Sequence, residues 1–120
     1  MKFITALAAL TLVAAPAQAE TVYLDCNLKR VSDGHVTDWQ ISFNENEQSV
    51  TRFYVQGGSQ TTFRNASISP AAIAWKQRVS GFTLSGSINR ADGQVQSFLG
   101  SKLMAQGQCV KAAPPVERAF

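Results

Sequence analysis

Histidine, cysteine and charged side chains are scarce in this chain. Its 120 residues include one histidine, His35, and two cysteines, and 16% of the positions are charged. A single histidine without a Cys-x-x-Cys pair lacks the ligands of a zinc site, and the sequence has no Gly-x-Ser-x-Gly segment to hold a nucleophilic serine. We therefore expect no catalytic residues, no metal and no cofactor, and we predict that the protein is not an enzyme.

A strong excess of charge of one sign is also missing. The formal net charge is +3, which is far below the basic excess of a nucleic-acid-binding domain, so nucleic acid is not an expected partner. Most acidic residues precede residue 48, which leaves the later strands weakly positive. Such a face would attract an anionic envelope glycan or an acidic protein loop; alternatively, the same side chains protect strand edges from aggregation. The basic residues concerned are Arg52, Arg64, Lys76, Arg78, Arg90 and Lys102.

Long apolar runs are absent apart from one near the N-terminus. Residues 3–15 are uncharged and mostly apolar, with Lys2 before them and Pro16 after them. This run is shorter than the roughly 20 residues of a membrane-spanning helix, and the Ala-Gln-Ala at 17–19 matches a signal peptidase site. We predict that residues 1–19 are a signal peptide that is removed, and that the mature chain is periplasmic or secreted from a bacterium and does not span the membrane.

The two cysteines, Cys26 and Cys109, lie near opposite ends of the mature chain. An even number of cysteines in an oxidising compartment is most simply a disulfide. Cys26 lies on the same strand face as Leu24 and Leu28, and Cys109 lies on the apolar face of its own segment, so both sulfur atoms are predicted to face the core. Two free thiols or a metal pair are the alternatives.

Alternation of apolar and polar residues runs through the mature chain, and no long stretch shows helical spacing. The alternation is clearest at 36–43 and 82–89. Period two with one apolar face is typical of a half-buried antiparallel strand. The predicted strands are 21–30, 36–43, 49–55, 61–66, 71–78, 82–89, 95–98 and 102–109.

Turn residues separate these strands, and Gly34 and Gly93 each follow an aspartate, where a hairpin turn needs left-handed backbone. The pattern predicts an all-β fold, either a small antiparallel up-and-down barrel or a compact sandwich, of about 7–8 strands. A disulfide between the first and last strands favours the barrel, because those strands become neighbours when a sheet curls round on itself. We predict one β domain at 20–110 and an extended, proline-containing tail at 111–120.

The aromatic residues divide into core candidates and surface candidates. The core candidates share the apolar parity of their strands; they are Trp39, Phe43, Phe53, Phe63 and Phe82. Tyr54 and Trp75 lie near basic residues, and aromatics flanked by arginine are common where sugars or proteins dock. Trp75 also shares parity with Ile73, so core packing is the alternative for it. The candidate binding face is Arg52, Tyr54, Trp75, Arg78 and Arg90.

Several short segments carry a resemblance to known sequences. Cys26, the Ile-Ala-Trp at 73–75, the Ser-Ile-Asn-Arg-Ala-Asp-Gly at 87–93 and the Gly-Gln-Cys at 107–109 resemble small exported proteobacterial proteins of unknown function, which implies a β fold. The Thr-Leu-Ser-Gly-Ser at 83–87 is similar to the Ser-Gly segment of periplasmic inhibitors of C-type lysozyme, which are disulfide-stapled β-barrels. We therefore predict a non-catalytic exported envelope protein that acts as a small binding or interaction module. Inhibition of a lysozyme-like enzyme is the alternative function.

Overall fold

The computed structural model describes residues 20–114, which form an all-β fold built on one antiparallel sheet. The predicted signal peptide at 1–19 and residues 115–120 of the predicted tail lie outside the described residues. None of the described residues forms a helix long and apolar enough to cross a membrane.

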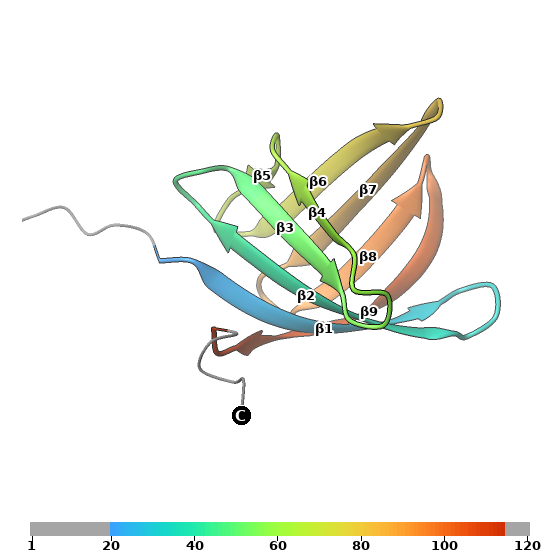
Figure 1. Cartoon of the computed structure of the whole chain (residues 1–120), viewed down its shortest axis with the longest axis horizontal. Coiled ribbons are helices and arrows are strands. Elements are labelled where there is room, and N and C mark those ends of the chain that lie inside the picture. Colours follow the sequence, from blue (N-terminus) through green and yellow to red (C-terminus); the bar gives the residue numbers. More distant parts are fainter. Residues whose placement is uncertain (1–19, 115–120) are drawn as a thin grey trace, which may run out of the picture.

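Nine strands follow one another along the described chain (Figure 1). They are β1 (Val22–Arg30), β2 (Val36–Asn44), β3 (Ser49–Tyr54), β4 (Gln60–Phe63), β5 (Ser67–Ile68), β6 (Ala72–Val79), β7 (Phe82–Asn89), β8 (Gln94–Leu99) and β9 (Lys102–Ala112). Each predicted strand has a counterpart, and the additional one is β5, which is too short to show an alternation. Because β9 continues to Ala112, residues 111 and 112 belong to a strand and not to the predicted tail.

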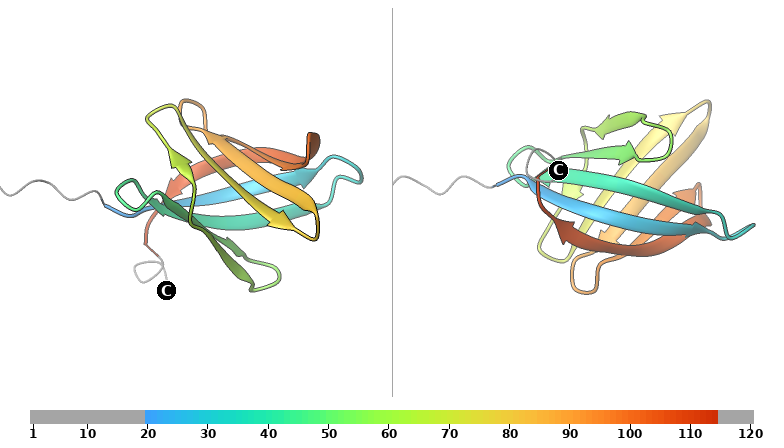
Figure 2. Two further views of the ribbon diagram at one scale, coloured as in Figure 1. Left: turned by 90° about the horizontal axis from the view of Figure 1, so that it is seen from above. Right: turned by 60° about the horizontal axis from the view of Figure 1, so that its bottom comes forward.

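The strand order in the sheet is β4-β3-β2-β1-β9-β8-β7-β6-β5. The first and last strands, β1 and β9, are therefore neighbours in the middle of the sheet, where they run side by side (Figure 2). The sheet curves into a half-barrel whose opening lies between strands from the middle of the chain (Figure 1). The first and last strands were expected to become neighbours by closing a barrel. They are neighbours here in the middle of an open sheet, so their pairing does not close a barrel.

Cys26 and Cys109 lie directly opposite each other in the β1–β9 pair and form the predicted disulfide. Both residues are buried on the inner face of the half-barrel. The covalent link therefore fastens the centre of the sheet.

The two predicted Asp-Gly turns are confirmed. Gly34 has φ +75° and Gly93 has φ +80°, a left-handed backbone that glycine adopts without a steric penalty. The side chain of Asp33 accepts a hydrogen bond from the His35 N–H at 2.9 Å, which fixes the β1–β2 turn. Asp92 accepts one from the Gln94 N–H at the same distance in the β7–β8 turn.

The core fills the inner face of the half-barrel with side chains from alternate strand positions. Its most deeply buried members are Leu28, Ile41, Val50, Ile73 and Val95. Three of the five predicted core aromatics, Trp39, Phe43 and Phe63, are buried there.

Two of the predicted core aromatics lie elsewhere. Phe82 is 61% exposed, because it pairs with Val79 at the tip of the β6–β7 hairpin, beyond the end of the core. Phe53 is half-buried and pairs with Gln40, on the outer face of the sheet. Its neighbours Arg52 and Tyr54 take the inner positions of β3.

The opening between β4 and β6, called the seam below, is closed over part of its length. The main-chain N–H of Ala66 donates to the carbonyl of Gln48 at 3.1 Å, and the N–H of Ile68 donates to the Gln48 side chain at 3.1 Å. Next to these bonds, the rings of Phe63 and Trp75 stack with their centroids 5.8 Å apart. Among the described residues, no strand pairs with residues 75–79 of β6 on the side away from β7.

Candidate functional site

A cluster of one arginine and four aromatic residues lies inside the half-barrel at the seam. The arginine is Arg52, and the surrounding residues are Trp39 of β2, Tyr54 of β3, Phe63 of β4 and Trp75 of β6. Arg52 points inward because it lies opposite the buried Ile41 and shares the parity of the buried Val50. These five residues are called the arginine cage below.

The guanidinium of Arg52 lies against three aromatic rings. Its carbon atom is 4.4 Å from the centroid of Tyr54, 5.0 Å from that of Trp39 and 5.1 Å from that of Phe63. A cation within about 6 Å of an aromatic face is attracted by the ring quadrupole, by about 0.5–2 kcal/mol depending on its desolvation. The rings therefore hold the cation at the inner face of the sheet without a carboxylate.

The rings of the cage also contact one another across the seam. Trp39 meets Tyr54 and Trp75 edge-on, with centroids 5.9 and 6.3 Å apart. Trp75 completes the link by stacking on Phe63. The cage thus joins the β2–β3–β4 side of the half-barrel to β6 through side chains, at a place where the strands themselves are not paired.

Two hydrogen-bond donors of the cage have no partner among the described residues. They are the Nε of Arg52 and the indole Nε1 of Trp39, and both atoms are buried. Trp39 is 4% exposed as a residue, so water has little access to its indole N–H. Both groups donate and neither accepts, so a partner of either would have to be an atom that accepts hydrogen bonds.

The electrostatics of the cage are those of a cation without a counter-ion. Burial lowers the pKa of Arg52 below its ordinary value, and the nearby Tyr54 opposes this effect. Arginine nevertheless keeps its proton at any ordinary pH, so the charge is permanent. The ion pairs found in residues 20–114 join Arg30 to Asp33 and Arg90 to Glu45, and neither includes Arg52.

The wider surroundings of the seam are also positive. The sequence contains no aspartate or glutamate between residues 48 and 91, a segment that supplies β3 to β7. The topology places β3 and β4 on one side of the seam and β6 and β7 on the other. An acid-free stretch that is continuous in sequence therefore becomes both borders of the opening.

The structure brings together three of the five residues predicted to form a binding face. Arg52, Tyr54 and Trp75 all belong to the arginine cage, although they face the interior and not an exposed patch. Trp75 is 4% exposed, so the alternative of core packing is the correct one for it.

The other two predicted residues lie apart from the cage. Arg78 is exposed at the far end of β6. Arg90 follows β7, where its guanidinium lies over the ring of Phe43, donates to the Ser69 carbonyl at 2.8 Å and pairs with Glu45 at 3.5 Å. The five residues therefore do not form one continuous face.

Sequence reasoning assigned Trp39 and Phe63 to the core and missed their contact with Arg52. The sequence did contain one indication of this contact. Arg52 lies on the same face of its strand as Val50 and Tyr54, which are apolar and aromatic, so its side chain is expected to point inward. An arginine on an inner face needs partners, and aromatic rings are the partners found here.

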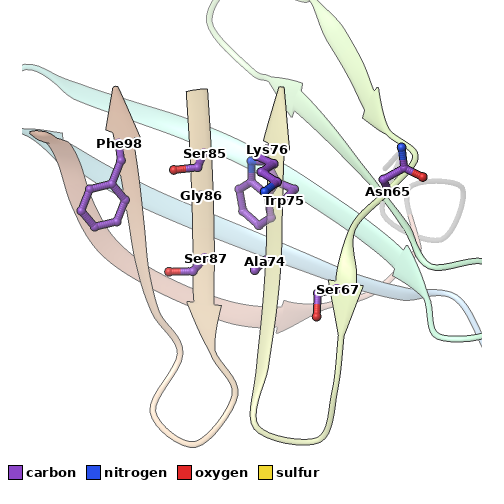
Figure 3. Close-up of a pocket in the computed structure, with 9 residues that line it drawn as sticks. All are labelled: Asn65, Ser67, Ala74, Trp75, Lys76, Ser85, Gly86, Ser87 and Phe98. Atoms are coloured by element: carbon purple, nitrogen blue, oxygen red, sulfur yellow. The ribbon is translucent and has the colours of Figure 1, made fainter. Parts of the chain in front are cut away.

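Several hollows lie along the sheet, and two of them are relevant to binding. One, of about 390 Å³, lies beside β6 and β7, with small residues at its centre and Phe98 at one side (Figure 3). The other, of about 350 Å³, is at the Phe43 end of the half-barrel, where Arg90 and Lys111 flank an apolar floor. In residues 20–114, no group of three or more His, Cys, Asp or Glu side chains is placed to hold a metal ion.

Comparison with protein-family models, curated proteins and solved structures gives no match for this chain. The function is therefore argued from the geometry of the site.

Proposed function

We propose that this chain is a non-catalytic, exported binding module of the cell envelope that takes up an anionic group at the arginine cage. The observation that carries the proposal is the guanidinium of Arg52, held by three rings and without an acidic partner among the described residues. A carboxylate is the anionic group that matches a guanidinium best, because the two form paired, charge-assisted hydrogen bonds.

The chemistry of binding follows from the unpaired donors. A buried donor without a partner costs about 1–3 kcal/mol, and a hydrogen bond to a charged group contributes about 1.5–3 kcal/mol. An arriving carboxylate would satisfy Arg52, whose Nε is buried and unpaired. The aromatic rings exclude water around this contact, which strengthens it.

The test is a titration followed by NMR, in which the side-chain Nε–H of Arg52 and the indole N–H of Trp39 are observed directly. Acetate and benzoate are the probes, and sulfate and phosphate are the comparison anions. We expect saturable shifts of both signals with the carboxylates. An Arg52→Met variant, in which only the Trp39 signal remains, loses the shift of that signal, whereas Arg64→Met, which removes an exposed cation, retains the shifts of both signals. An equal Trp39 shift in the Arg52→Met variant, or a linear response without saturation, would contradict the proposal.

Export is part of the proposal and has its own test. The protein is expressed with its complete N-terminus in a bacterium, and its intact mass is measured from the periplasmic fraction. We expect a chain that begins at Glu20 and is lighter by two hydrogens, because of the Cys26–Cys109 disulfide. A full-length or reduced chain would contradict the periplasmic assignment.

One observation favours the alternative that the carboxylate belongs to an enzyme. Glycosidases use a pair of carboxylates in the active site, and the acid-free segment around the seam is complementary to such a pair. The Ser-Gly segment of the resemblance lies within β7, where Gly86 is covered by Trp75. The test is the rate of a C-type lysozyme with excess mature protein: inhibition that disappears with Arg52→Met supports this alternative, and an undiminished rate removes it.

A further inference from the structure

Strand β6 has a free edge beside the seam. On that side β5 pairs with Ile73 and Ala74, and no described strand continues the pairing. The N–H of Ser69 donates to the carbonyl of Ala72 at 3.0 Å, so the main-chain groups of Ala72 point away from β7. Because this direction alternates along an antiparallel strand, the main-chain groups of Lys76 and Arg78 point to the same open side.

Free main-chain groups of an edge strand are a template for another strand. They pair with any extended chain whose side chains are tolerated, and this is how several domains bind peptides. The free part of β6 consists of residues 75–79, which remain in ladder register with β7 on the other side. The pairing with β7 therefore holds the edge in the extended conformation that strand addition requires.

The charges beside this edge favour an acidic partner. Lys76 and Arg78 are exposed on β6, and Arg64 is exposed on the connection between β4 and β5. The absence of acidic residues between 48 and 91 leaves these cations without acidic neighbours in their own segment. An antiparallel pair of two β6 edges would place Lys76 and Arg78 against their own copies, and opposed like charges are destabilising. A second copy of this chain is therefore disfavoured as the occupant.

A hollow of about 390 Å³ adjoins the same edge (Figure 3). Its floor is made of small residues from β6 and β7, and Phe98 stands at the side toward β8. Asn65 and Ser67 lie at the opposite side, toward β5, with Lys76 between the two sides. A side chain on the outer face of an added strand would lie over this hollow, which has room for one apolar residue. The residues of the floor are Ala74, Ser85, Gly86 and Ser87.

We propose that the free edge of β6 binds an extended acidic segment of a partner protein, which adds to the half-barrel as a further strand. Main-chain hydrogen bonds to Lys76 and Arg78 provide the pairing. The side chains of the same two residues and of Arg64 select acidic residues in the partner, and the hollow accepts one apolar side chain. This site shares Trp75 with the arginine cage but does not include Arg52, whose guanidinium faces the interior.

The experiment uses the mature, disulfide-bonded chain and a short synthetic peptide with the pattern Val-Thr-Glu-Thr-Glu, in which the valine and both glutamates lie on one face of the strand, as the hollow and the side chains of Lys76 and Arg78 do. Binding is followed by NMR, and the readout is protection of the Lys76 and Arg78 amide protons from exchange with solvent. Two further peptides carry N-methyl groups on alternate residues, one on each edge. We expect the unmodified peptide to protect both amides. One of the N-methylated peptides, whose methyl groups face β6, should fail to bind while the other still binds.

Protein variants separate charge from pairing. The double variant Lys76→Ala/Arg78→Ala should weaken binding by about tenfold or more, because it removes two charged contacts. Lys102→Ala, which removes an exposed cation from β9, should leave binding unchanged. Arg52→Met should also leave it unchanged, so that failure of the arginine cage and failure of the β6 edge are distinguished.

Three outcomes would overturn the inference. The first is equal binding of both N-methylated peptides, which would show that strand pairing is not involved. The second is displacement of the peptide by polyphosphate with no amide protection at any stage, which would identify a general polyanion surface. The third is no binding of the acidic peptide at millimolar concentration, which would assign Lys76 and Arg78 to protection of the edge from aggregation.

Discussion

Trp75 and Gly86 lie directly opposite each other in the β6–β7 pair, and the indole ring of Trp75 occupies the space that a side chain at position 86 would fill. The ring is fixed on its other sides by the edge of Trp39 and by stacking on Phe63. The absence of a side chain at position 86 therefore leaves the space that the Trp75 ring occupies in the arginine cage.

Replacing this glycine tests that relationship. In Gly86→Ala the new Cβ would collide with the Trp75 ring, and we expect the free energy of unfolding to fall by about 1–3 kcal/mol, as for other overpacked cores. The measurement is reversible urea unfolding followed by tryptophan fluorescence. Gly57→Ala is the matched control, because a Cβ there meets no atom within 4 Å. Equal stability of the two variants would show that the ring moves aside freely.

Removing the charge from the cage should separate stability from binding. In Arg52→Met an apolar side chain of similar length replaces a half-buried cation among aromatic rings. Replacing buried charges by apolar residues of similar volume is often neutral or stabilising by about 1–4 kcal/mol. We expect a melting temperature that is unchanged or raised, together with loss of the carboxylate response. A large loss of stability would show instead that Arg52 is a structural element of the core.

The Cys26–Cys109 disulfide should contribute strongly to stability. It closes a loop with a sequence separation of 83 residues, and the chain-entropy model gives an upper value of about 4.5 kcal/mol for a loop of this length. We expect the oxidised protein to lose up to this amount when reductant is added, as measured by the urea midpoint. In the Cys26→Ala/Cys109→Ala variant the urea midpoint should be lower than that of the oxidised protein and should not change when reductant is added.

The turn between β1 and β2 should weaken in acid. The hydrogen bond from the His35 N–H lowers the pKa of Asp33 below its ordinary value of 3.8, and Arg30 acts in the same direction. Because the folded-state pKa is the lower one, the stabilisation is complete above pH 3.8 and is lost as the pH falls through the folded-state value. The protection of the His35 amide proton, taken as the intrinsic exchange rate at each pH divided by the observed rate, should fall in that range. Asp33→Ala should show low protection of this amide at every pH.

Alternation along the sequence predicted the strands and the disulfide, because both depend on which face of a strand a residue occupies. Alternation failed to predict burial where burial depends on how far along its strand a residue lies, or on the place of that strand in the sheet. Phe82 has the parity of the core, yet it lies beyond the end of the core at a hairpin tip. The strand pattern around Phe53 was assigned to the wrong face, because an arginine on the inner side was not expected.

The candidate site was predicted in part. Arg52, Tyr54 and Trp75 were recognised from their residue types, and these three come together. Their common environment could not be predicted, because it requires β3 and β6 to face each other across the seam. Strand order is a property of long-range pairing, and the local pattern of a strand carries no information about its distant neighbours.

The central position of β1 and β9 has a consequence for how the protein is made. Synthesis begins with the N-terminal strand and ends with the C-terminal one. One of the two neighbours of β1, β9, is therefore absent until nearly all of the chain has been made. Before that moment the described strands form two meanders, β1 to β4 and β5 to β8, which share no strand pairing and meet through side chains at the seam. The final strand joins the two meanders into one sheet, and a nascent or truncated chain that lacks it has neither this pairing nor the disulfide partner of Cys26.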